Sequence, residues 1–75
     1  MQGVKPPQYI ISVDEVKVIS FDKADVTPEE VTKFEYELEF DEEWMGWKYD
    51  IDFSVENIKY ECEINAVSGT VIKFN

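Results

Sequence analysis

The chain has 75 residues and a formal net charge of −10, because 17 acidic side chains outnumber seven basic ones. It contains no histidine and no arginine, which excludes an imidazole base, a Ser-His-Asp triad and histidine-ligated metals. Binding to DNA or RNA depends on cationic side chains that release counterions, so the charge argues against it. The length allows one small domain.

The composition is typical of a globular chain, with 44% hydrophobic and 15% aromatic residues. Its single cysteine, Cys62, cannot form an internal disulfide, so the core must supply the stability. No apolar run approaches the roughly 18 residues of a membrane-spanning helix. The first ten residues do not resemble a signal peptide, so for an exported protein we expect the targeting segment to have been removed.

Residues 1–10 contain the pair Pro6-Pro7, which suits neither a helix nor a central strand, and we expect a leader or linker there. Residues 11–75 are expected to form a single domain. A capping box predicts its first helix: the Ser12 hydroxyl can accept from the Glu15 amide, and the Glu15 carboxylate can reach back.

An apolar stripe at helical spacing follows this cap and predicts one amphipathic helix of about three turns. The stripe consists of Val13, Val16, Ile19, Ser20 and Ala24. A second capping signal, Thr27-Pro28-Glu29-Glu30, has proline at the first helical position and predicts a single helical turn that redirects the chain.

From Lys33 the period changes to two, which predicts antiparallel strands with one apolar and one acidic face. A hairpin at 42–46 and a tight turn at 56–57 separate three such segments, and Ser68-Gly69 precedes a short strand over 70–74. The side chains expected to face inward are Phe34, Tyr36, Leu38, Phe40, Trp47, Tyr49, Ile51, Phe53, Ile58, Tyr60, Cys62, Ile64 and Ala66. The predicted fold is α+β, with one N-terminal helix packed on a three- to four-stranded antiparallel meander in a cystatin-like layout.

Two stretches of this sequence resemble the PepSY domain family. The helix start and stripe carry the first part of its pattern, in Ile11, Ser12, Asp14, Glu15, Val16, Ile19, Ser20, Phe21, Ala24 and Val26. The last long strand and its turn carry the second part, in Tyr60, Glu61, Glu63, Ile64, Ala66 and Gly69. The departures are Val16 and Ser20 for alanines, Asp25 for a glycine, Asn65 for aspartate and Ser68 for threonine.

PepSY domains are non-catalytic modules of secreted metallopeptidase propeptides and of bacterial cell-envelope proteins and lipoproteins. The resemblance therefore implies an extracellular or envelope protein that binds a peptidase, or another envelope protein, and inhibits or chaperones it. It implies a signal or lipoprotein leader ahead of residue 1. It defines no catalytic, cofactor-binding or metal-binding residue, and we expect none.

The residues themselves offer little catalytic chemistry. Cys62 is expected in the core, because it lies between inward-facing Tyr60 and Ile64 with no basic neighbour on that face. Paired carboxylates occur in any chain this acidic, and so short a chain provides no cleft to raise the pKa of one of them. Asp41-Glu42-Glu43 lacks the spacing of a calcium loop.

Partner contacts are the more promising hypothesis, and two surfaces are candidates. The outward-facing carboxylates of the strands are expected on one side of the sheet, as a solvated face or as a docking surface for a basic partner. They are Glu35, Glu37, Glu39, Asp50, Asp52, Glu61 and Glu63. Trp44 and Met45 are expected at the first hairpin tip, where Trp44 either anchors a partner or folds back over the sheet edge or helix end.

Strand edges add a third means of contact, since an extended peptide can pair with them. The expected function is thus a non-enzymatic module that binds another protein. Two alternatives remain: a spacer within a larger envelope protein or lipoprotein, and, ranked last, an acidic decoy that imitates DNA.

Overall fold

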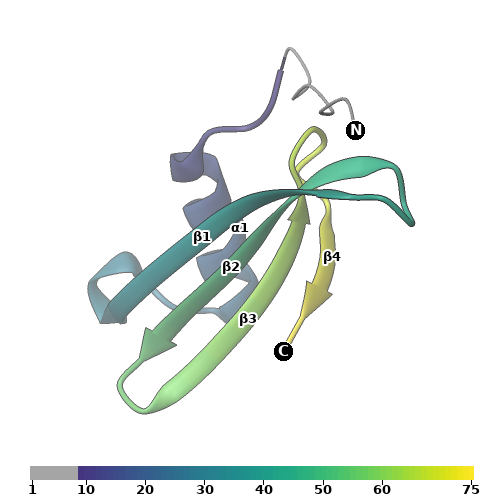
Figure 1. Ribbon diagram of the computed structural model, residues 1–75. Coiled ribbons are helices and arrows are strands. Elements are labelled where there is room, and N and C mark those ends of the chain that lie inside the picture. The colour runs from purple at the N-terminus through teal and green to yellow at the C-terminus, as the bar shows by residue number, and fades with distance from the viewer. Residues whose placement is uncertain (1–8) are drawn as a thin grey trace.

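The computed structural model describes residues 9–75, and most of the expected leader lies outside this range. Figure 1 shows one helix beside a four-stranded sheet. The elements are α1 (Val13–Ala24), the 3₁₀ turn η1 (Pro28–Glu30), β1 (Val31–Asp41), β2 (Gly46–Val55), β3 (Ile58–Asn65) and β4 (Val71–Phe74). The strands are antiparallel in the order β1-β2-β3-β4, which confirms the predicted α+β meander.

Helix α1 begins where the capping signal predicts. The Glu15 amide donates to the Ser12 hydroxyl oxygen at 3.1 Å, which satisfies one N–H of the first turn. The helix ends at Ala24, and the capping residue Asp25 adopts the left-handed conformation with φ of 60°. Ser20 is fully buried, and its hydroxyl is satisfied within the helix by the Val16 carbonyl at 2.8 Å.

The segment before the helix is hydrogen-bonded to the sheet. The Ile11 amide donates to the Ala66 carbonyl at 2.8 Å, and the Tyr49 hydroxyl donates to the Ile11 carbonyl at 2.8 Å. Ile10, the last residue of the expected leader, also packs against the core.

The predicted single turn is also present. At η1 the Thr27 amide donates to the Glu30 carboxylate at 2.8 Å, and the chain then turns directly into β1. β1 starts at Val31, two residues before the expected Lys33, and its pairing with β2 is irregular between these residues.

The core lies between α1 and one face of the sheet. Phe21 belongs to it, with 6% of its surface exposed, although the predicted stripe did not include this residue. Its ring contacts Phe34 and Phe53 edge-on, at centroid distances of 5.8 and 5.0 Å. The buried hydrophobic residues are Val16, Phe21, Tyr49, Ile51, Phe53, Cys62, Ile64 and Ala66.

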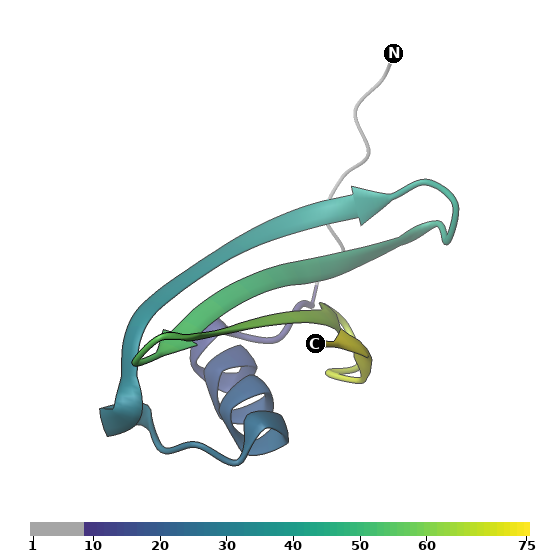
Figure 2. The ribbon, with the colours of Figure 1, turned by 90° about the horizontal axis from the view of Figure 1, so that it is seen from below.

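The helix covers only part of the sheet. Its backbone lies closest to β3 and β4, and its Phe21 ring reaches β1 and β2, while the far ends of β1 and β2 extend beyond it (Figures 1 and 2). The described chain is accordingly elongated, with extents of 41 × 19 × 16 Å. We call residues 39–48 the distal hairpin.

Two side chains expected inside lie outside. Tyr36 is 53% exposed and Ile58 is 55% exposed. Tyr36 lies on the edge strand β1, two residues beyond Phe34, which the Phe21 ring of α1 contacts, and Ile58 begins β3 beside the tight turn. The alternation therefore predicted the correct face, but two of its positions receive little cover.

Candidate functional site

The turn of the distal hairpin is organised by Asp41. Its Oδ1 accepts from the amide of Glu43 at 3.0 Å and from that of Trp44 at 3.3 Å. Its backbone carbonyl accepts from the Met45 amide at 2.6 Å. Side-chain bonds of this kind stabilise a turn without help from the core. Asp41 therefore fixes the position of the two candidate anchor residues, Trp44 and Met45.

Trp44 folds back on its own hairpin. A Cβ atom added at Gly46 would lie 2.9 Å from the Trp44 ring, so the ring rests on the Gly46 backbone. Trp44 is nevertheless 43% exposed, and Met45 beside it is 73% exposed. Trp44 is not among the side chains packed against the core cluster, and the tip presents an aromatic ring beside a flexible thioether.

Lys48 connects the distal hairpin to β3. Its ammonium lies 3.3 Å from Asp41 Oδ2 and 3.0 Å from Glu63 Oε1, and these are the ion pairs found between residues 9 and 75. Hydrogen bonding to Glu63 raises the pKa of Lys48, and hydrogen bonding to Lys48 lowers the pKa of Asp41. The sequence had shown Lys48 only as a partial offset to the acidic face, because pairing across three strands depends on their register.

The register places the predicted carboxylates in two rows across the outer face of the sheet. One row is Glu35, Asp52 and Glu61, and the other is Glu37, Asp50 and Glu63. We call these six residues and Glu39 the acidic face.

The pKa values of two residues of the acidic face, Asp50 and Glu39, are raised. Burial, and then the charges of Glu39, Glu63 and Asp52, raise the pKa of Asp50. Hydrogen bonding with Glu37, followed by burial, raises the pKa of Glu39. Burial, hydrogen bonding and like charges therefore all disfavour the ionised forms of these two carboxyl groups in the folded state.

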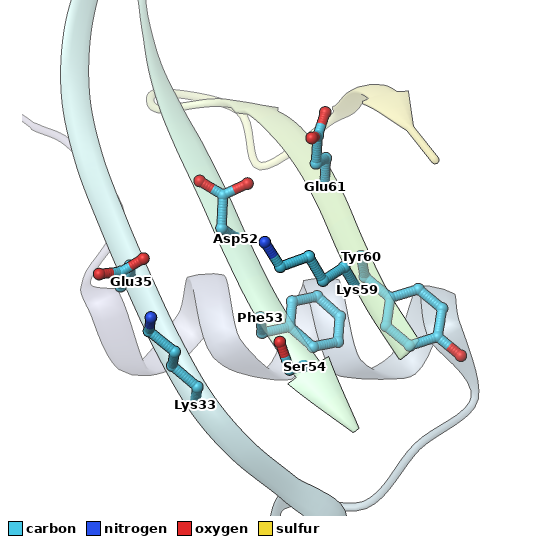
Figure 3. A pocket seen from close by; sticks show the side chains of 8 residues that line it. All are labelled: Lys33, Glu35, Asp52, Phe53, Ser54, Lys59, Tyr60 and Glu61. Atoms are coloured by element: carbon cyan, nitrogen blue, oxygen red, sulfur yellow. The ribbon is translucent and has the colours of Figure 1, made fainter. Parts of the chain in front are cut away.

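A shallow groove of about 210 Å³ lies on the same face, near the β2–β3 turn (Figure 3). Lys33 and Lys59 line it together with Glu35, Asp52 and Glu61, so both signs of charge are present. Among residues 9–75, no group of three or more carboxylate or cysteine side chains is placed to hold a metal ion. The groove thus presents charged groups of both signs side by side.

Cys62 lies in the core, as predicted, with 1% of its surface exposed. Burial raises the pKa of its thiol to about 11, and the Lys23 charge opposes this only in part. A thiol held in its neutral form is a poor nucleophile.

The third candidate surface is the outer edge of β1. β1 ends the strand order and pairs only with β2 within residues 9–75. This edge is 11 residues long, whereas the opposite edge strand, β4, has four residues.

Comparison with family models, curated proteins and solved structures finds no match for this chain. No helix in the described range is long and apolar enough to span a membrane.

Proposed function

We propose that this protein is a non-enzymatic, exported module of the PepSY type that binds a peptidase or another cell-envelope protein and modulates it. The observation that carries the proposal is the distal hairpin, which extends beyond the helix-covered core and exposes Trp44 and Met45. Aromatic and methionine side chains are enriched in protein interfaces, and tryptophan is prominent among the residues that dominate binding energy.

The construction of the hairpin supports this role. Asp41 and Lys48 hold its shape through hydrogen bonds and ion pairs, so the tip does not need to be packed against the helix. A preformed tip loses less conformational freedom on binding than a flexible loop would. The acidic face supports the proposal as well, because it would steer a partner with a basic surface during approach.

Affinity capture tests the proposal. The immobilised chain is exposed to culture supernatant and to solubilised envelope of the source cells, and bound proteins are identified by mass spectrometry. We expect the main captured protein to be a secreted peptidase or an envelope protein. The Trp44→Ala variant should retain at least tenfold less of it than the wild type does.

The control is Val18→Ala, which truncates another exposed apolar residue, 68% exposed on α1, away from the hairpin. We expect it to capture the partner as the wild type does. Capture of nothing would favour a spacer, and capture of a nuclease or DNA-binding protein would favour the decoy.

A further inference from the structure

The outer edge of β1 combines a free backbone with two chemically distinct faces. Its backbone groups on that side meet no other strand within residues 9–75. On one face the strand carries Glu35, Glu37 and Glu39, and on the other Phe34, Tyr36 and Leu38. Same-face side chains on a strand are spaced about 7 Å apart. A chain that paired with β1 would therefore meet carboxylates and apolar groups in alternation.

The apolar side of this edge is open at its centre. Tyr36 is 53% exposed, and its ring lies 6.1 Å from the Phe34 ring and 6.2 Å from the Tyr49 ring, measured between centroids. A side chain of an added strand would lie beside Tyr36 and extend the aromatic row that already leads into the core. Aromatic and β-branched residues are favoured as cross-strand neighbours of tyrosine.

We propose that β1 accepts, by strand addition, an extended segment of another protein in which lysine or arginine alternates with apolar residues. This inference rests on the proposed function as a binding module and names the chemistry of its partner. The basic side chains of the segment would lie opposite the three glutamates, where opposite charges stabilise a cross-strand pair. Its backbone would supply the hydrogen bonds that the edge lacks.

Other occupants fit this edge less well. Two copies aligned along the whole of β1 in antiparallel fashion would place Glu35 of each opposite Glu37 of the other, and only Lys33 would gain an acidic neighbour, Glu39. Each copy also carries a charge of −10. Within the chain, residues 1–8 contain Pro6-Pro7, which has no N–H groups to give to a strand ladder.

The test uses the full chain and a synthetic peptide in which six lysines alternate with valines. The matched peptide has the same sequence and charge but is N-methylated at alternate residues, which removes strand donors. We expect the unmethylated peptide to bind at least tenfold more tightly and to slow hydrogen exchange in β1. Equal affinities, or protection confined to β4, would overturn strand addition at β1.

Charge recognition is tested by Glu37→Lys against Glu29→Lys, since Glu29 is exposed in η1, ahead of the first residue of β1, and both variants change the net charge equally. We expect Glu37→Lys to bind the peptide about fivefold more weakly than Glu29→Lys. Equal affinities of the two variants would overturn the alternating recognition.

Sedimentation of the wild type without peptide completes the test, and we expect a monomer. A dimer whose β1 amides are protected would assign the edge to a second copy and overturn the proposal. Partner binding through Trp44 is tested separately, by affinity capture. Either proposal, binding through Trp44 or strand addition at β1, can therefore be refuted while the other stands.

Discussion

Two neighbouring side chains show the difference between the helix-covered part of the sheet and its exposed part at β1. Tyr36 and Ile51 are cross-strand partners on β1 and β2, and both belong to the inward-facing alternation. Ile51 is fully buried beneath the helix, whereas Tyr36 is 53% exposed. The same strand pattern thus produces a core on one side and an open apolar surface on the other, and the position of α1 decides which.

The lengths of the elements explain this division. A helix of 12 residues spans about 18 Å, whereas a strand of 11 residues spans about 36 Å. One helix cannot cover the whole of β1 and β2. We therefore expect stability to come from the helix-covered part, and we propose that partners bind at the distal hairpin and the β1 edge.

The largest expected effect separates these two parts directly. Ile51→Ala should lower the free energy of unfolding by about 2–5 kcal/mol, because it leaves a cavity in the core. Tyr36→Ala, on the same pair of strands, should cost less than about 1 kcal/mol, because its ring is already half in water. Urea denaturation of both variants measures the difference. Similar losses would show that the β1 side is as well packed as the core.

Alternation and capping signals were sufficient to predict the helix, the single turn, the meander and the side of the sheet on which each carboxylate lies. They did not reveal Phe21, which lies at the flank of the helical stripe and is buried because β1 and β2 present Phe34 and Phe53 to it. Nor did they reveal the exposure of Tyr36. Both depend on how the helix lies over the sheet, which no local pattern encodes.

The sequence predicted the position of the distal hairpin but not the contacts of its side chains. The sequence left Trp44 with two interpretations, and the structure places its ring on Gly46, a contact between near neighbours in a turn. Asp41 ahead of the turn is a typical side-chain cap for it. Lys48 pairs with Asn65 in the β2–β3 register, so its link to Glu63 runs diagonally between the strands, and alternation alone does not reveal it.

A smaller effect is expected where the chain start meets the sheet. Tyr49→Phe removes the hydroxyl that donates to the Ile11 carbonyl at 2.8 Å, and should cost about 1 kcal/mol. Hydrogen exchange of the Ile11 amide should become faster, since this segment loses one of its hydrogen bonds to the sheet. Tyr36→Phe is the control, because its hydroxyl lies on the more exposed ring. An equal loss in both variants would contradict a specific role for the Tyr49 bond.

The charges of the acidic face should lower the stability of the fold, whereas the Tyr49 hydrogen bond raises it. Because the pKa values of Asp50 and Glu39 are raised in the fold, the folded state binds protons more readily than the unfolded chain. Stability should therefore fall as the pH rises through these raised values. The lowered pKa of Asp41 acts in reverse, and its contribution is lost only below its ordinary value of 3.8.

Asp50→Asn tests this balance. It should stabilise the protein by about 0.5 kcal/mol at pH 7, because it removes like-charge contacts, and raise Tm by about 2–4 °C. The wild type should melt at a higher temperature at pH 4.5 than at pH 7, and the variant should show a smaller difference. A wild type that loses stability steadily between pH 7 and pH 4.5 would contradict the role given to Asp50.

The smallest effect on stability is expected at Gly46. Gly46→Ala displaces the Trp44 ring, which is the free end of a side chain, so stability should change by less than about 0.5 kcal/mol. In a Trp47→Phe background, the fluorescence of Trp44 should shift to longer wavelength. Gly69→Ala is the contrast, because Gly69 has φ of +80° and should cost about 1 kcal/mol. An unchanged spectrum would mean that Trp44 does not rest on Gly46.

We propose that the distal hairpin binds a partner and contributes little to folding. The most direct measurement is the affinity of the captured partner for wild type and for Trp44→Ala, with Tm recorded on the same samples. We expect at least a tenfold loss of affinity, with Tm lowered by no more than about 4 °C. Unchanged affinity together with a much lower Tm would assign Trp44 to the fold and contradict the claim.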